Sequence, residues 1–266
     1  MRISNIFKRK IKFKNISYRP KPNSKKRIEN KITIRRGKLF TVAYSDLGKK
    51  IFVNQQIFRK VHNVWRSGRT KYEDPEIRLE IRERIPEYWK QEETAANMVL
   101  ELKENKRKFF IKVGNSWPME INGKIERLNF ARPVQEMGLL KLISEKNFNV
   151  IPAHFGITMQ GYNFIIYDYV PFITVADALE KGLISGRTYK KINKLLDGVT
   201  EEVNSTLKKE YRKYGFDKLN LTYDLKAGNT FIDVNTKQIY IFDPNSLSID
   251  QMSAQMLDKY KIKKPQ

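Results

Sequence analysis

The sequence lacks cysteine altogether and has only two histidines, His62 and His154. Without cysteine the chain cannot form disulfides, thiolate zinc sites, iron–sulfur clusters or a cysteine nucleophile. Neither histidine has a serine or an acid at a spacing typical of catalysis, so we expect both to be structural. No run of about 18 apolar residues occurs, which argues against a transmembrane helix. The basic N-terminus does not open into an apolar segment, so a secretory signal is not expected either.

Acidic residues are nearly absent from one part of the chain, the first 40 positions. This segment holds fifteen lysines and arginines against one acid, Glu29, and accounts for +14 of the net charge of +23. We expect residues 1–40 to form a basic, flexible arm in front of a less basic body. Such an arm attracts anionic partners, whether nucleic acid, a membrane surface or an acidic protein, and its composition equally suits a solvated tail without a partner.

The first half of the body alternates between short apolar runs and charged segments. The pattern predicts strands at 38–44 and 50–54 around a turn, followed by a short helix at 55–64. Residues 66–85 are too rich in charge to be assigned to an element. Two further strands are expected at 98–102 and 109–113.

The second half has clearer helical periodicity. Pro133 suits the first turn of a helix at 133–146. The other expected elements are a hairpin of strands 150–159 and 162–169, helices at 175–181 and 188–214, and a late hairpin of strands 230–234 and 238–242. Strands and one helix come first and mostly helix follows, which indicates an α+β fold with two lobes that divide near residues 169–171.

Polar side chains gather around the late hairpin. Asn229 comes just before its first strand and Asp243 just after its second, so the hairpin brings the two residues close together. Asp224 and Lys226 lie a few residues upstream, in a glycine-containing loop that can turn toward the same point. Carboxylate and amide oxygens suit a hard cation such as Mg²⁺, and a carboxylate outside the metal can accept a proton from a hydroxyl group. The alternative is that these residues only cap turns.

The stretch from Asp224 to Asn229, DLKAGN, resembles the catalytic loop D-L-K-x-x-N of the protein-kinase-like superfamily, in its serine/threonine form. Asp243 follows Asn229 by fourteen residues, where that family places a magnesium-binding aspartate. The resemblance implies that Asp224 is the catalytic base and that Lys226 neutralises the transferred phosphoryl group. It also implies that Asn229 and Asp243 bind Mg²⁺.

The resemblance extends upstream of the loop. In the apolar run FFIKV, Lys112 matches the family's ATP-phosphate lysine, and Glu136 is its expected ion-pair partner, with a solvated helix carboxylate as the alternative. The remaining ATP contacts implied by the resemblance are Thr94, Ala95 and Ala96 in a phosphate-covering loop near 91–97, the backbone of Asp168, Tyr169 and Val170 around adenine, and Ile166 at the back of the pocket.

Several features depart from the family's pattern. The loop near 91–97 contains no glycine, and Thr222-Tyr223 replaces the usual His-Arg before the catalytic aspartate. Only 23 residues follow Asp243, so we expect a minimal kinase-like domain with a truncated C-terminal lobe. The expected divisions are an arm at 1–40, an extension of unknown role at 41–86, a small β-rich N-lobe at 87–168 and a helical C-lobe at 169–266.

The sequence therefore predicts a bilobal, protein-kinase-like phosphotransferase that uses ATP and Mg²⁺. The favoured acceptor is a protein serine or threonine, and a small-molecule acceptor stays open. Two alternatives have a different basis: a pseudokinase scaffold, favoured by the glycine-free loop, and a nucleic-acid-binding or anion-binding protein acting through residues 1–40. We expect a cytoplasmic location, or delivery into a host cell if the protein is an effector.

Overall fold

The structure is a computed structural model. It describes residues 32–36, 40–86, 93–115, 118–121, 124–127, 132–159, 162–213, 225 and 227–242. The chain divides into two compact units. The first, called here the sheet unit, comprises Ile28–Gly138 and Pro152–Val170. The second, the helical unit, has its described residues in Leu139–Ile151 and 171–242.

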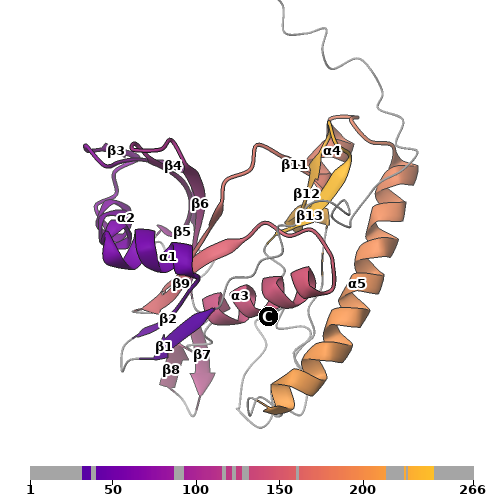
Figure 1. The fold of residues 1–266 in the computed structure, drawn as a ribbon, viewed down its shortest axis with the longest axis horizontal. Coiled ribbons are helices and arrows are strands. Elements are labelled where there is room, and N and C mark those ends of the chain that lie inside the picture. The colour runs from indigo at the N-terminus through magenta and orange to yellow at the C-terminus, as the bar shows by residue number, and fades with distance from the viewer. Residues whose placement is uncertain are drawn as a thin grey trace, which may run out of the picture. The chain divides into compact units, whose positions relative to one another are not determined.

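The sheet unit is built on an eight-stranded antiparallel sheet (Figure 1). The strands are β1 (Thr33–Arg36), β2 (Phe40–Tyr44), β3 (Lys71–Glu73), β4 (Ile77–Pro86), β5 (Glu93–Leu102), β6 (Lys108–Asn115), β9 (Ala153–Met159) and β10 (Tyr162–Asp168). Their order across the sheet is β1-β2-β9-β10-β6-β5-β4-β3. Strands β7 (Pro118–Ile121) and β8 (Lys124–Arg127) form a separate hairpin between β6 and the next helix. The strands expected at 98–102 and 109–113, and the hairpin expected at 150–159 and 162–169, are confirmed.

One face of this sheet is covered by the short helix α1 (Asp46–Gly48), the π-helix η2 (Lys49–Asn54) and α2 (Ile57–Arg66). The helix expected at 55–64 is thus confirmed, but the strand expected at 50–54 is wrong. Ile51 and Phe52 are consecutive and both buried, whereas the alternation of a strand would send them to opposite faces. Aromatic contacts fix this layer, with the ring centroids of Phe52 and Phe109 5.2 Å apart.

The division expected between residues 86 and 87 is not present in the sheet. β3 and β4 arise from the charge-rich segment that the sequence left unassigned, and β4 pairs with β5 along most of its length. β2 pairs with β9, and β1, from the expected arm, pairs with β2. Strands from the expected arm, extension and N-lobe therefore form one sheet.

The other face of the sheet meets the start of helix α3 (Arg132–Glu145). Strand pairing places Gly156 of β9, Ile165 of β10, Lys112 of β6 and Asn97 of β5 in one row. A Cβ atom built on Gly156 would lie only 2.5 Å from the Cβ atom of Pro133, the second residue of α3. The first turn of α3 therefore packs closely on the face that carries Lys112.

The helical unit contains helices α4 (Val175–Glu180) and α5 (Gly186–Lys213) and a small antiparallel sheet. That sheet has the order β11 (Ile173–Thr174), β12 (Thr230–Asp233) and β13 (Gln238–Ile241), with the 3₁₀ helix η3 (Ala227–Asn229) leading into β12. Its core joins the apolar stripe of α5 to the hairpin through residues that include Ile192, Leu196, Val199, Val203, Ile232, Ile239 and Ile241. Both expected helices and the late hairpin are confirmed.

Together the two units make a mixed α+β protein with a large antiparallel sheet, as the sequence predicts at that level. Among the described residues, no helix combines the length and apolar character that a membrane crossing requires.

Candidate functional site

Lys112 occupies the middle of the large sheet. Its strand, β6, has β10 on one side and β5 on the other, and Lys112 is opposite Ile165 and Asn97. Its neighbours Ile111 and Val113 point to the other face, into the core under η2 and α2. Because side chains alternate along a strand, the lysine projects from the α3 face of the sheet and is partly buried there.

Glu136 lies one turn after Pro133 on α3 and is fully buried. The alternative of a solvated helix carboxylate is therefore wrong. Burial of a carboxylate is costly unless a cation or hydrogen-bond donors compensate for it. Since Pro133 is seated on Gly156, in the same row as Lys112, the two predicted residues lie on the same side of the sheet.

The end of β10 is held by a polar network that the sequence did not reveal. Asp168 Oδ1 is 2.9 Å from Nη2 of Arg107 and 3.1 Å from Nε2 of His154. Burial raises the pKa of the Asp168 carboxyl, but the hydrogen bonds and charges of His154 and Arg107 outweigh it, and the net pKa is below its usual value. Asp168 is thus an ionised anchor where the expected adenine-contacting segment begins.

His154 continues this network away from Asp168. Its ring is buried, and its Nδ1 lies 3.2 Å from the hydroxyl oxygen of Ser45. The same hydroxyl oxygen accepts a hydrogen bond from the Gly48 amide and caps α1. A serine, a histidine and an aspartate in contact have the composition of a hydrolase triad, but Ser45 is only 1% exposed and its oxygen is used as a helix cap. The network is structural, as expected for His154, and it ties α1 to the end of β10.

The backbone of residues 168–170 offers fewer free donors than expected. The Asp168 amide donates to the carbonyl of Pro152 at 2.9 Å, and the Tyr169 amide donates to the carbonyl of Lys108 at 3.2 Å. Adenine would therefore have to be recognised through the Val170 amide and the carbonyl groups of this segment. The Tyr169 side chain is 39% exposed. Ile166, by contrast, is fully buried on the core face, opposite Ile111, rather than on the Lys112 face.

Thr94, Ala95 and Ala96 were expected in a phosphate-covering loop, and this placement is wrong. All three lie within β5, which begins at Glu93, and Ala95 and Ala96 pair with Ile85 and Arg84 of β4. Ala96 is buried in the sheet, opposite Val113 of β6. The small side chain of Ala96 fits the packed interior of the sheet. The connection at 87–92 lies outside the described residues.

The predicted catalytic loop leads into the hairpin of the helical unit. Asn229, the last residue of η3, accepts a hydrogen bond at its carbonyl from the Phe242 amide, at 3.0 Å. This bond closes the open end of the β12–β13 hairpin, so Asn229 lies beside Phe242, the residue that precedes Asp243. Asp224, Lys226 and Asp243 themselves lie outside the described residues.

The loop is anchored from within the unit. Leu225 and Ala227 are buried in the core, and the Leu225 amide donates to the hydroxyl oxygen of Thr200 on α5 at 3.2 Å. Within the described part of the chain, no group of three or more histidines, aspartates and glutamates is placed to hold a metal ion. The donor set that the sequence assigns to Mg²⁺, one amide and one carboxylate, suits that cation chemically.

Comparison of the chain with models of known protein families and with curated proteins finds no match. The candidate residues therefore have to be interpreted within each unit. The sheet unit holds a lysine on a central strand and a buried glutamate on the helix above the same face. The helical unit holds an anchored loop that leads into a hairpin.

Proposed function

We propose that this chain is an ATP- and Mg²⁺-dependent phosphotransferase of protein-kinase-like fold, acting on serine or threonine hydroxyls of a protein. In this proposal the sheet unit is the nucleotide-binding lobe and the helical unit is a minimal C-terminal lobe. Lys112 contacts the ATP phosphates, and Glu136 holds its ammonium group. Asp224 accepts the proton of the attacking hydroxyl.

The observation that carries the proposal is the placement of Lys112 and Glu136. The antiparallel strands β4, β5 and β6 follow one another along the chain, and Lys112 is on the third of them. The next helix along the chain, after the β7–β8 hairpin, is α3 with Glu136. Protein kinases place their phosphate-binding lysine on the third strand of the small lobe and its glutamate partner on the following helix. A glutamate that is fully buried on the lysine's side of the sheet supports this assignment, because its burial requires compensation.

Catalysis would rest on position and charge. Lys226 neutralises the charge that develops on the transferred group, and Asp224 orients the acceptor hydroxyl for in-line attack. Asn229 and Asp243 would hold Mg²⁺, which supplies further charge neutralisation at the phosphates. The hydrogen bond between Phe242 and Asn229 supports this pairing, because it keeps the two ends of the hairpin together.

The experiment is transfer of labelled phosphate from Mg-ATP to the protein itself and to a generic serine/threonine protein substrate. Lys112→Met, Asp224→Asn and Asp243→Asn should each lower transfer by about a hundredfold or more, the usual effect of removing a catalytic or charge-neutralising group. Lys108→Met is the matched control, because Lys108 begins the same strand and its ammonium pairs with Glu101 at the surface. This control should retain full transfer.

The outcomes separate the alternatives. Transfer that survives Asp224→Asn and Asp243→Asn contradicts the proposed catalytic roles. A protein that shows no transfer but is stabilised against heat by ATP, with the stabilisation lost in Lys112→Met, is a nucleotide-binding pseudokinase scaffold. A protein that does not bind ATP at all is not a kinase-like protein, and its basic N-terminal segment then becomes the leading candidate for function.

A further inference from the structure

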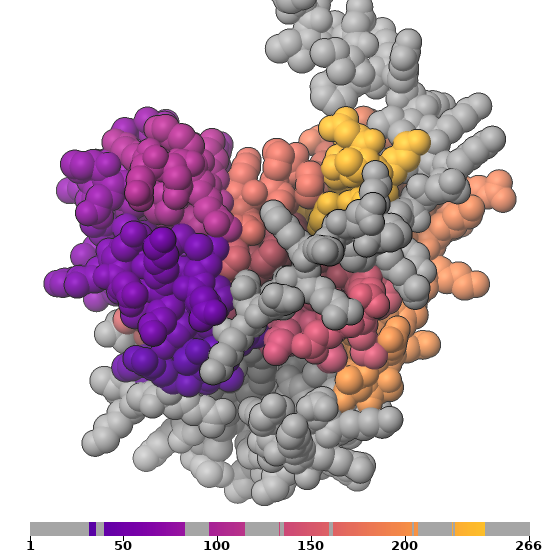
Figure 2. Space-filling model, in the orientation of Figure 1, coloured from indigo at the N-terminus to yellow at the C-terminus, as the bar shows by residue number. Residues whose placement is uncertain are grey.

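The N-terminal half of α5 carries a stripe of positive charge. Arg187, Lys190, Lys191 and Lys194 are spaced three, one and three residues apart, which places them on one face of the helix. All four side chains are exposed, and none forms an ion pair with another described residue. Side chains of α5, orange in Figure 2, project outward from the surface of the molecule. The stripe is therefore available to an anionic partner.

The N-terminal end of α5 carries cations where the helix dipole disfavours them. The stripe begins in the first turn, at Arg187, and the first acid of the helix is Asp197. The dipole favours acids in the first turn and cations in the last turn, and its effect falls off beyond those turns. The first turn is capped by Ser185, whose hydroxyl oxygen accepts a hydrogen bond from the Thr188 amide at 3.2 Å. The helix dipole therefore does not account for the cations at this end of α5.

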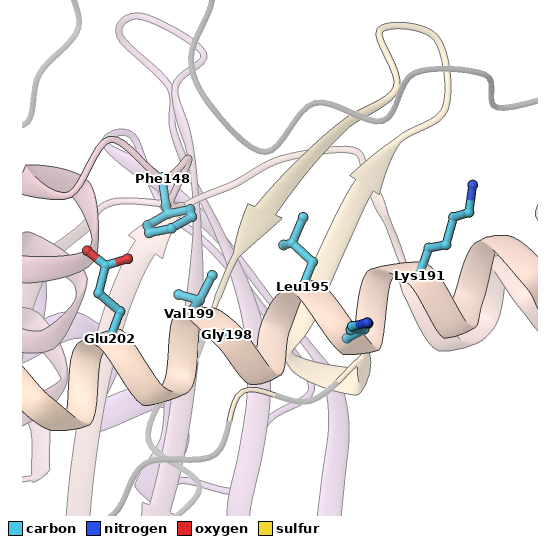
Figure 3. Close-up of a pocket in the computed structure, with 7 residues that line it drawn as sticks. Phe148, Lys191, Leu195, Gly198, Val199 and Glu202 are labelled. Atoms are coloured by element: carbon cyan, nitrogen blue, oxygen red, sulfur yellow. The ribbon is translucent and has the colours of Figure 1, made fainter.

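A groove runs along α5 next to this stripe (Figure 3). It has a volume of about 420 Å³ and is lined by Phe148, Lys191, Lys194, Leu195, Gly198, Val199 and Glu202. Phe148, Leu195 and Val199 lie on the same side of the helix and form an apolar floor, while Lys191 reaches outward at one end. At the other end Glu202 forms an ion pair with Lys146, at 2.9 Å. The groove is therefore apolar in the middle and positive at one end.

Gly198 leaves a stretch of exposed helix backbone in the groove, and packing inside the protein does not explain why a glycine is present there. It lies in the interior of a 28-residue helix, where glycine is less favourable than alanine. A Cβ atom at this position would meet nothing within 4 Å, so no neighbour requires a glycine. The missing side chain leaves the helix backbone open to close approach from outside, beside the apolar floor.

We propose that this groove binds an acidic peptide segment of a partner protein. Carboxylates of the segment contact Lys191 and Lys194, and one large apolar side chain packs on Phe148, Leu195 and Val199. Gly198 lets the bound backbone approach α5 closely. The apolar floor favours a peptide over nucleic acid, because an apolar side chain of the peptide gains from the floor and the phosphates of nucleic acid do not. None of the residues that line the groove belongs to the set proposed for phosphotransfer.

The test measures binding of a fluorescent peptide pool by anisotropy, using the full chain at physiological salt. In the pool, glutamate and aspartate flank one position that carries leucine, phenylalanine or methionine. The double variant K191E/K194E should weaken binding about tenfold, and Gly198→Leu should weaken it to a similar extent by filling the groove. The control K49E/K50E makes the same charge change at two exposed lysines of the sheet unit and should bind normally.

Charge reversal provides the decisive comparison. K191E/K194E should gain affinity for a pool in which lysines replace the acids, and K49E/K50E should not. An equal gain in K49E/K50E would mean that only the net charge of the protein matters. Gly198→Ala should raise the thermal midpoint, so that a loss of binding in Gly198→Leu cannot be attributed to a weaker helix. Peptide binding that is unchanged in K191E/K194E, or equally reduced in K49E/K50E, overturns the proposal. So does an effect of K191E/K194E confined to single-stranded DNA or to vesicles of phosphatidylserine.

Discussion

The contact between α3 and the sheet predicts a specific cost for one added methyl group. Gly156→Ala would place a Cβ atom 2.5 Å from the Cβ atom of Pro133. Carbon atoms prefer a separation of about 3.5–4.0 Å, so α3 or β9 has to move by roughly 1 Å. Overpacking of this kind costs about 1–3 kcal/mol, and the gain from replacing a strand glycine returns about 0.5–1 kcal/mol. The net expectation is a loss of about 1 kcal/mol in the free energy of unfolding, within a range of roughly 0–2.5 kcal/mol.

Urea unfolding, followed by circular dichroism, measures this loss. The matched control is Gly114→Ala on β6, where a Cβ atom would meet nothing within 4 Å, so its stability should stay the same or rise slightly. Because Glu136 lies one turn after Pro133, Gly156→Ala should also reduce the thermal stabilisation by ATP that the proposed function requires. If Gly156→Ala is as stable as Gly114→Ala, α3 is not seated on Gly156 and the argument that places Glu136 on the Lys112 face is refuted.

Three further predictions concern other parts of the chain. Gly48→Ala should lower the thermal midpoint more than Gly156→Ala does, because its Cβ atom would lie 1.8 Å from the backbone carbonyl oxygen of His154. Equal thermal midpoints for the two variants would contradict this prediction. Burial raises the pKa of Asp74, but hydrogen bonds from Lys60, Tyr72 and two backbone amides lower it to about 2. Its contribution to stability is therefore complete above its unfolded pKa of about 4 and is lost as pH falls toward 2. Urea midpoints of wild type and Asp74→Asn should converge over that pH range, and parallel curves would exclude the contribution. Deleting residues 1–31, which leaves β1 intact, should remove salt-sensitive binding to single-stranded DNA, and an unchanged dependence of affinity on salt would place such binding elsewhere.

Elements whose signals are local were predictable from the sequence. The apolar stripe of α5 repeats along a single helix, and its residues Ile192, Leu196, Val199 and Val203 are all buried. The β12–β13 hairpin closes over a short turn, so its pairing needs no information from distant segments. Asn229 and its neighbourhood were found for the same reason, since the loop and the hairpin lie within a short stretch of chain.

The large sheet was harder to predict, because its pairings join distant segments. β2 pairs with β9 more than a hundred residues away, and no local pattern indicates that partner. In β4 a signal was present: Ile77, Leu79 and Ile81 alternate with charged residues and are buried. The charged residues between them masked this alternation. They belong to the exposed face of the strand, where Arg78 forms an ion pair with Glu73 of β3. The link between Ser45 and His154 depends on the same distant pairing and left no trace in the sequence.

Two residues that are unfavourable for stability lie where α3 packs on the sheet, and this supports a functional role for that contact. Gly156 weakens its strand and is required by the close approach of Pro133, and Glu136 buries a carboxylate where an apolar side chain would normally favour folding. Replacing a buried ionic group by a well-packed apolar one is often neutral or stabilising, so stability alone does not explain Glu136. The glycine brings the helix close to the row that contains Lys112, and the helix carries the glutamate to the same face. Both costs therefore serve one outcome, a lysine and a carboxylate held on the same side of the sheet, which is the arrangement that the proposed binding of ATP phosphates uses.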